Sequence, residues 1–244
     1  MLWPTGSLLK SKVIERVPWE EFIKRRFSWR QGEQVVIIGP TGSGKTTIID
    51  AIKDYRLYNI FFGTKKADPL YNKLIREGYR HIQDVSEIKN YDSNNFLLWP
   101  KFPGEINDHV EIQKATFRKA LNRIVKEGGW TLIVDEAKYL AEFLGLNKEL
   151  SYCVDQLRSN NCSVVCAAQR PAWFPQSVLA NATHVFLFKS TNRDDQIRLA
   201  DVGGIDASVV REAARGLGDH EFIYLKTRGV NSNMVISQVT RGGK

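Results

Sequence analysis

Short runs of apolar residues recur along the chain and are separated by longer segments in which apolar and polar positions mix. Continuous runs such as Val35–Ile38 are typical of strands that are buried on both faces of a sheet. Strands that alternate with helices predict an α/β fold, with a mainly parallel central sheet and helices on both faces. The predicted strands are Gln34–Ile38, Asn59–Phe62, Phe96–Trp99, Thr131–Val134, Ser163–Ala167, His184–Phe188 and Glu221–Leu225.

The segments between these runs carry apolar residues at helical spacing. Val110–Lys126 repeats apolar positions on one side of a helix, and the glycine pair Gly128–Gly129 ends the pattern. Glycine just beyond an amphipathic segment is a common helix stop. The other predicted helices are Thr46–Lys53, Asp68–Glu77 and Lys148–Asn160.

Both ends of the chain differ from this alternating middle. Pro4, Gly6 and Pro18 interrupt residues 1–31, which we therefore expect to form an N-terminal arm. Residues 32–228 carry the alternating pattern and are predicted to form the main domain. The polar residues 231–233 separate two apolar runs, so residues 229–244 are predicted to add a hairpin strand and a tail.

Composition narrows the class of protein. The chain has no run close to the roughly 20 apolar residues of a membrane span, so we expect a cytoplasmic protein without one. Its three cysteines lack the spacing of a zinc site, and we expect them to be reduced and buried. The net charge of +8 favours acidic partners, above all nucleic acid.

The first predicted strand runs directly into the pattern G-x-x-x-x-G-K-[ST], which is followed by a predicted helix. Glycines let successive backbone N–H groups face phosphate oxygens, and the helix N-terminus adds free donors. We expect Lys45 to reach the β- and γ-phosphates of ATP and the Thr46 hydroxyl to bind Mg²⁺. The predicted nucleotide-binding residues are Gly39, Pro40, Thr41, Gly42, Ser43, Gly44, Lys45, Thr46 and Thr47.

Two acidic residues, Asp135 and Glu136, end the apolar run Thr131–Val134. Ligands of parallel sheets bind at the carboxyl ends of strands, so Asp135 is expected to hold Mg²⁺. Glu136 is expected to act as the catalytic base that polarises the attacking water, which favours ATP hydrolysis over phosphotransfer to a small molecule. Another predicted strand leads to Gln169, which fits either a sensor of the γ-phosphate or an ordinary polar turn.

Three motifs together resemble the FtsK–HerA superfamily of DNA-pumping ATPases: Gly39–Thr46, Leu132–Glu136 and Ala168–Pro171. The last one discriminates within the P-loop enzymes, although Ala168 stands where the family has a hydroxyl residue. The resemblance covers roughly residues 32–228 and implies a RecA-like fold. It also implies that Arg158 reaches the nucleotide of a neighbouring subunit, with Arg193 as the second choice.

The resemblance, together with the small size of the chain, is greatest to the viral genome-packaging ATPases of this superfamily. It implies an ATP-hydrolysing motor that translocates double-stranded DNA into a capsid, in the host cytoplasm or the virion. The motor would assemble as a homo-oligomeric ring, a hexamer, and capsid or portal-vertex proteins are expected partners. Lys65–Lys66 and Lys101–Phe102 are candidate DNA contacts, and solvated lysines are the alternative. The competing hypothesis is a secretion, conjugation or assembly ATPase that acts on protein or in another kind of DNA transfer.

Overall fold

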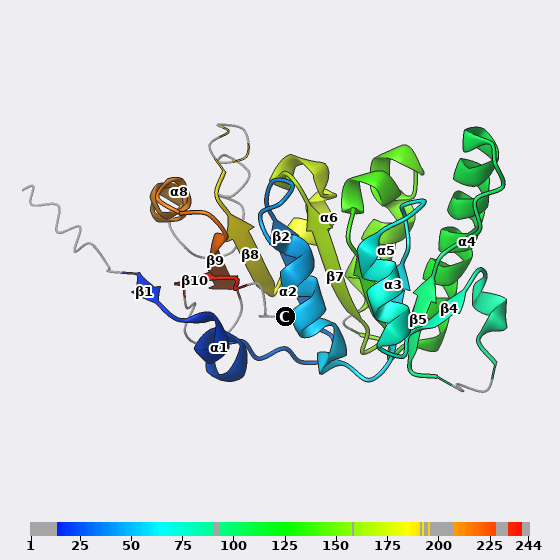
Figure 1. Ribbon diagram of the computed structural model, residues 1–244, viewed down its shortest axis with the longest axis horizontal. Coiled ribbons are helices and arrows are strands. Elements are labelled where there is room, and N and C mark those ends of the chain that lie inside the picture. The colour runs from blue at the N-terminus through cyan, green and yellow to red at the C-terminus, as the bar shows by residue number, and fades with distance from the viewer. Residues whose placement is uncertain are drawn as a thin grey trace, which may run out of the picture.

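The computed structural model describes residues 14–89, 93–157, 159–190, 192, 195, 207–227 and 234–240. They form one ten-stranded sheet in the order β1-β10-β9-β8-β2-β7-β6-β3-β5-β4 (Figure 1). The predicted α/β class is confirmed. The strands are β1 (Glu15–Arg16), β2 (Gln34–Ile38), β3 (Asn59–Phe62), β4 (Arg80–Ile82), β5 (Asn95–Leu98), β6 (Thr131–Val134), β7 (Ser163–Ala168), β8 (His184–Phe188), β9 (Glu221–Lys226) and β10 (Met234–Gln238).

The middle of the sheet is parallel, as predicted. β2 lies between β7 and β8, and β7 lies between β2 and β6. The antiparallel pairs involve β9, which runs against both β8 and β10. Because β2, β6, β7 and β8 run in the same direction, their carboxyl ends meet at one edge of the sheet.

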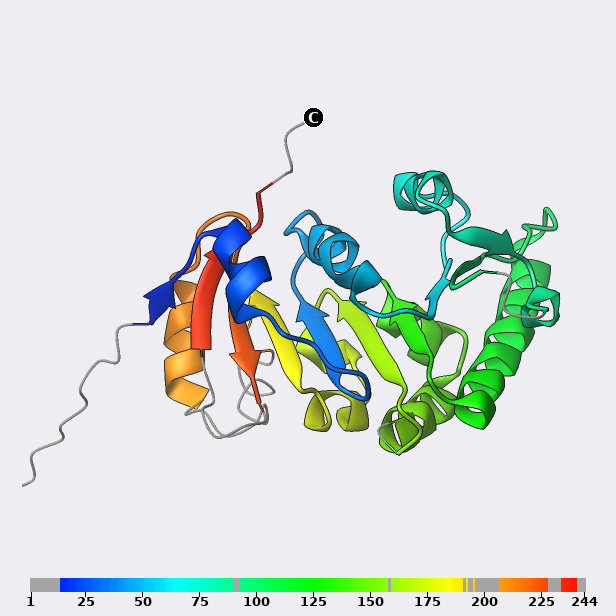
Figure 2. The ribbon, with the colours of Figure 1, turned by 90° about the horizontal axis from the view of Figure 1, so that it is seen from below.

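Helices cover both faces of the sheet (Figure 2). Alternate residues of β2 belong to different faces: Val35 and Ile37 pack in one apolar cluster, and Val36 and Ile38 pack in the other. One face carries α1 (Trp19–Glu21), α2 (Lys45–Ile52) and α3 (Pro69–Arg76), and the other carries α4 (Ile106–Glu127), α5 (Asn147–Leu157), α6 (Gln176–Ala180) and α8 (Ala207–Arg215). None of the described helices combines the length and the hydropathy that crossing a membrane requires.

Local sequence explains where α3 and α4 begin and end. The Asp68 side chain accepts a hydrogen bond from the Leu70 N–H at 2.9 Å, and Pro69 fills the first helical position, where its missing N–H costs nothing. α4 ends at Gly128, whose φ is +71°. A Cβ on Gly128 would lie 2.7 Å from the Asn160 carbonyl oxygen, so a larger residue would strain this stop.

Residues 14–31, the described part of the expected arm, pack against the sheet. Phe22, Phe27 and Trp29 are buried in the cluster that also holds Val35 and Ile37. β1 pairs in parallel with β10 at the edge of the sheet. This segment therefore contributes aromatic side chains and an edge strand to the main body of the protein.

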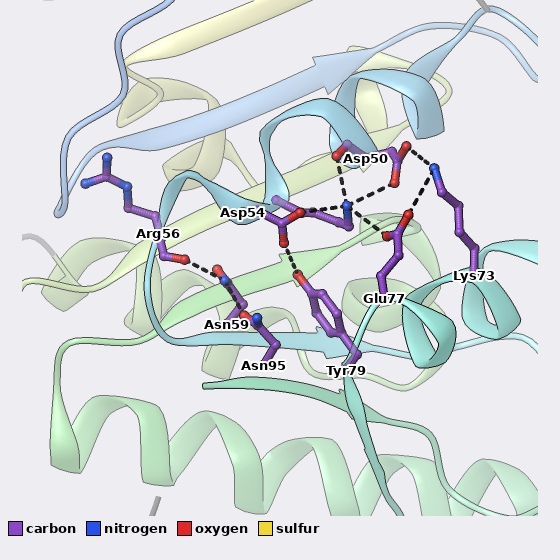
Figure 3. A network of polar contacts seen from close by, with 9 residues as sticks. Asp50, Asp54, Arg56, Asn59, Lys73, Glu77, Tyr79 and Asn95 are labelled. Carbon is purple, nitrogen blue, oxygen red and sulfur yellow. Dashed lines mark hydrogen bonds and ion pairs between the residues drawn. The ribbon is translucent and has the colours of Figure 1, made fainter. Parts of the chain in front are cut away.

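A lysine among carboxylates joins α2 to α3 (Figure 3). Lys53 follows α2, and its side chain is only 5% exposed. Its Nζ lies 2.9 Å from Asp54, 3.1 Å from Glu77 and 3.2 Å from Asp50. Because Glu77 stands at the end of α3, these contacts fix the C-terminal ends of the two helices against each other. We call Lys53 and these three carboxylates the Lys53 cluster.

Candidate nucleotide site

The glycine-rich loop after β2 has a backbone that requires its glycines. Gly42 has φ +80° and Gly44 has φ +117°, a region that residues with a Cβ rarely adopt. A Cβ on Gly44 would also lie 2.5 Å from Val239 Cγ2, and one on Gly39 would lie 2.7 Å from Phe188 Cβ. The loop therefore needs glycine at Gly39 and Gly44 to pack closely against Phe188 and Val239.

Free hydrogen-bond donors gather around this loop. α2 begins at Lys45, and the first turn of a helix leaves N–H groups without intrahelical acceptors. The buried Ser43 Oγ has no hydrogen-bond partner among the described residues. Lys45 Nζ donates to the carbonyl oxygens of Gly39 at 2.7 Å and Pro40 at 2.9 Å. This set of donors and a buried cation fits the phosphates of a nucleotide.

The two acids at the end of β6 lie near the loop. β7 is the only strand between β2 and β6 in the described sheet, with Ile38 opposite Ala168 and Val134 opposite Cys166. Burial raises the pKa of Glu136, and the charge of Asp135 raises it further. Burial lowers the pKa of Lys45, while Asp135 and Glu136 act in the opposite direction. The electrostatic coupling of these three groups indicates one shared site.

Oxygen donors in this site fit a magnesium ion. Mg²⁺ prefers a few carboxylate and hydroxyl oxygens and keeps several waters. Asp135 is 6% exposed, and Thr46, which follows Lys45 in the first turn of α2, is an exposed residue. Asp135 and Thr46 remain the residues predicted to hold the ion, and their oxygens fit it.

A second lysine enters this site from a loop that the sequence offered as a candidate DNA contact, with solvated lysines as the alternative. Lys65 follows β3, and its Nζ lies 3.2 Å from Asp135 Oδ2 and 2.7 Å from Asp68 Oδ2. Burial lowers the pKa of Lys65, but the hydrogen bonds to Asp68 and Asp135 raise it above the ordinary lysine value. Sequence reasoning missed this place because no motif marks Lys65.

The remaining predicted residues are distributed differently. Gln169 follows β7 directly, and Gly39 N–H donates to the Ala168 carbonyl at 3.2 Å, so Gln169 begins beside the glycine loop. Arg170 Nε donates to Asp195 Oδ1 at 3.0 Å, which gives this arginine an intramolecular partner. Arg158 and Arg193 lie outside the described residues.

The structure adds a histidine that no sequence signal indicated. His220 precedes β9, and its Nδ1 lies 3.1 Å from the Ser43 carbonyl oxygen. His220 and Val239 line a cavity of about 200 Å³ together with the start of α2. A neighbouring cavity of about 460 Å³ extends past Phe188 and Lys189. Only tertiary structure brings these C-terminal residues to the glycine loop.

A separate cavity of about 200 Å³ combines positive and aromatic side chains. Lys66 Nζ lies 4.6 Å from the centre of the Phe102 ring, and the His109 ring packs edge-on against Phe102. Both His109 ring nitrogens are buried and lack partners among the described residues. We call this the basic–aromatic cavity; its lining residues are Lys66, His81, Gln83, Trp99, Pro100, Lys101, Phe102 and His109.

Comparisons with known proteins agree with this geometry. The P-loop containing region of the AAA domain matches residues 12–65. No curated protein sequence matches the chain. The genome packaging NTPase B204 from Sulfolobus turreted icosahedral virus 2, in complex with sulfate, is similar with a TM-score of 0.62 and 16% identity, over 87% of this chain and 98% of that chain. B204 has also been solved with AMPPCP and with ATP-gammaS.

Two further structures share the fold. VirB4 of Thermoanaerobacter pseudethanolicus has a TM-score of 0.60 and 10% identity, over 86% of this chain and 89% of that chain. The cytoplasmic domain of the type VII secretion ATPase EccC of Thermomonospora curvata has a TM-score of 0.52 and 13% identity, over 88% of this chain and 26% of that chain. The likeness to the viral packaging ATPases is thus confirmed at the level of the RecA-like fold, and the matched P-loop region supports an ATPase.

Proposed function

We propose that this chain is an ATP-hydrolysing motor that moves double-stranded DNA, in its sharpest form a packager of a viral genome. One observation carries the proposal: a single loop joins the nucleotide site to the basic–aromatic cavity. In this loop Lys65 pairs with Asp135, and the next residue, Lys66, lies over Phe102. A change at the phosphate end of ATP can therefore reach a positively charged surface through two adjacent residues.

ATP hydrolysis follows from the residues around the glycine loop. Lys45 and the first turn of α2 bind the phosphates, and Asp135 with Thr46 would hold the ion. Mg²⁺, when bound, offsets negative charge on the phosphate oxygens. Glu136 is half-buried next to Asp135, so its carboxylate is a stronger base than an exposed one and can take the proton of the attacking water. Gln169, which follows β7 beside the loop, would respond to the terminal phosphate.

The basic–aromatic cavity supplies the proposed DNA contact. Lysines bind phosphates without reading sequence, which suits a motor that must move along any DNA. Lys66 and Lys101 both line this cavity, although they come from different loops. The net charge of +8 adds a general attraction for the polyanion.

A ring is the second part of the proposal. A hexamer would place Arg158 of one subunit at the ATP of the next, and an arginine supplied in this way raises phosphoryl-transfer rates by about 10³–10⁵ in related systems. The test mixes wild-type subunits with Arg158→Ala subunits. We expect ATPase activity to fall more steeply than the wild-type fraction, whereas a strictly proportional fall would argue against action between subunits.

The direct test measures ATP turnover with and without long double-stranded DNA, at equal protein concentration and over a range of salt. We expect DNA to stimulate turnover and added salt to abolish the stimulation, because counterion release drives the binding. An equal mass of a non-nucleic polyanion serves as the control. Turnover that DNA leaves unchanged, or that any polyanion raises equally, would contradict the DNA motor.

The fold likeness to VirB4 and EccC favours one alternative, an ATPase that acts on a protein substrate or in another DNA-transfer system. Turnover stimulated by capsid or portal-vertex proteins and indifferent to DNA would support it. A packaging motor is expected to need both, because the DNA must enter a shell. We place such a motor in the host cytoplasm or the virion.

A further inference from the structure

Lys65 occupies a central position among the charged groups of the nucleotide site. Its Nζ lies 3.2 Å from Asp135 Oδ2, and its charge acts on both Lys45 and Glu136. The two lysines therefore approach the same pair of acids, Lys45 from the glycine loop and Lys65 from the end of β3. β3 is the strand next to β6 on the side away from β7, so Lys65 faces Asp135 across the site from the loop.

The backbone that carries Lys65 is held on both sides. Its N–H donates to the Tyr71 hydroxyl at 3.1 Å, and the Trp99 indole N–H donates to its carbonyl oxygen at 2.9 Å. The preceding carbonyl, that of Thr64, accepts from Gln113 at 3.0 Å. Three buried or half-buried side chains thus fix this short loop, which is more support than a solvated surface lysine needs.

The hydrogen bonds that support this loop also involve the segment that follows the catalytic acids. Gln113 is fully buried on α4, and its Oε1 accepts a hydrogen bond of 2.6 Å from the Tyr139 hydroxyl. Tyr139 begins the π-helical turn Tyr139–Phe143, three residues after Glu136. The loop that carries Lys65 is therefore joined by hydrogen bonds to the turn that follows Glu136.

The side chain of Lys65 is less enclosed than its backbone, although its ammonium pairs with Asp68 and Asp135. It is 44% exposed, and its four methylene groups allow the ammonium to travel several ångströms while the backbone stays fixed. Asp68, its other partner, caps α3 and remains in place. An ion pair with Asp135 is compatible with the ligand-free site, but a divalent cation at Asp135 would compete with this ammonium for the same carboxylate.

We propose that Lys65 is a phosphate-binding residue of the nucleotide site, which pairs with Asp135 before ATP binds and donates to the terminal phosphate afterwards. The proposal rests on the ATPase assignment and needs neither DNA nor a ring. Lys45 and Lys65 would then flank the terminal phosphate, and departure of that phosphate would return Lys65 to Asp135. Because Lys66 is the next residue, the exchange of Lys65 between Asp135 and the phosphate would also affect the basic–aromatic cavity.

The test measures the affinity for a non-hydrolysable ATP analogue and for ADP, each in EDTA and in Mg²⁺. For Lys65→Met we expect the affinity for the analogue in Mg²⁺, where the cation competes for Asp135, to fall about tenfold, as for the loss of one charge-assisted hydrogen bond. The affinity for ADP should stay within about twofold, because ADP lacks the phosphate that Lys65 binds. Lys65→Arg keeps the charge and should restore most of the preference for the triphosphate.

Two control variants separate the loss of phosphate binding from a loss of structural support. Asp68→Asn keeps a residue that caps α3 well but removes one of the two carboxylates that pair with Lys65. Its effect on nucleotide affinity therefore reports the structural contribution alone. Lys119→Met removes an equal charge from an ion pair on α4. Equal losses of ADP and analogue affinity in Lys65→Met, or no loss in either, would overturn the proposal. Wild-type protein that binds neither nucleotide would instead refute the proposed function itself.

Discussion

Two lysines lie among carboxylates in this molecule, one at each end of α3. Lys53 contacts Asp50, Asp54 and Glu77 at the C-terminal end of the helix, and Lys65 contacts Asp68 and Asp135 at the N-terminal end. The Lys53 side chain is 5% exposed and its partners all come from two packed helices. The Lys65 side chain is 44% exposed, and one of its partners ends a strand beside the glycine loop.

The difference shows how similar chemistry serves structure in one place and a ligand in another. Lys53 has three carboxylates within reach and little freedom, so its contacts are complete within the described fold. Lys65 shares Asp135 with the proposed ion and has a partly exposed side chain. Both lysines form ion pairs with carboxylates. They differ because Asp135, a partner of Lys65, lies at the carboxyl ends of the parallel strands, where ligands bind.

The largest expected effect lies at Lys45, the lysine of the glycine loop, which is buried as Lys53 is. Lys45→Ala removes the cation that the glycine loop surrounds, so ATP turnover should fall by at least about 10³-fold and nucleotide affinity should drop with it. The measurement is steady-state ATPase activity together with nucleotide titration. Normal turnover in this variant would show that the nucleotide site lies elsewhere. Lys65 would then have no functional role to set against the structural role of Lys53.

Glu136→Gln should separate binding from chemistry. The amide keeps the shape of the side chain but cannot accept the proton of the attacking water, so turnover should fall about 10²–10³-fold while ATP still binds. Single-turnover hydrolysis and a binding titration measure the two steps. Hydrolysis at the wild-type rate would assign the base to another residue.

Lys53→Met should change stability and leave the nucleotide site intact. The substitution removes the buried cation that three carboxylates share, and since these are partly exposed and Asp50 and Glu77 keep Lys73, we expect the free energy of unfolding to drop by about 2 kcal/mol. Denaturant unfolding measures the loss, and nucleotide affinity should not change. Lys73→Met is the matched control, because this more exposed lysine meets Asp50 and Glu77 at the same helix and should cost less. A change in nucleotide affinity with Lys53→Met would erase the distinction between the two lysines.

The smallest effect is expected at the basic–aromatic cavity. Replacing Lys66 and Lys101 together by Met should weaken DNA binding a few fold near physiological salt and lower the slope of log affinity against log salt by about 2, one for each phosphate contact. Titrations at several salt concentrations give the slope. An unchanged slope would mean that both lysines are solvated and that DNA binds elsewhere.

The sequence predicted the sheet and the phosphate loop because both have strong local signals. Continuous apolar runs marked seven of the strands within a residue or two, and the G-x-x-x-x-G-K-[ST] pattern marked the loop. β1 and β4 were missed, because strands of two and three residues show no period. The burial of Phe22 and Phe27 was missed for another reason: the partners of these rings lie on strands far along the chain.

The candidate site shows the same division. Lys45, Thr46, Asp135 and Glu136 stand in motifs whose chemistry is readable from spacing. Lys65 and His220 do not, because their place depends on which strands are neighbours and on how distant loops return to the same edge. Lys65 and Lys66 were named together as candidate DNA contacts, with solvated lysines as the alternative, because they follow a predicted strand; the structure places the two side chains at different sites.

The most direct measurement for the whole account is a crystal structure of the protein with Mg²⁺ and a non-hydrolysable ATP analogue. We expect the phosphates to lie at the start of α2, with Lys45 turned from the Gly39 and Pro40 carbonyls to the phosphate oxygens and the terminal phosphate facing Glu136. Phosphates bound at another place, or a Lys45 that still donates to those two carbonyls in the complex, would contradict it.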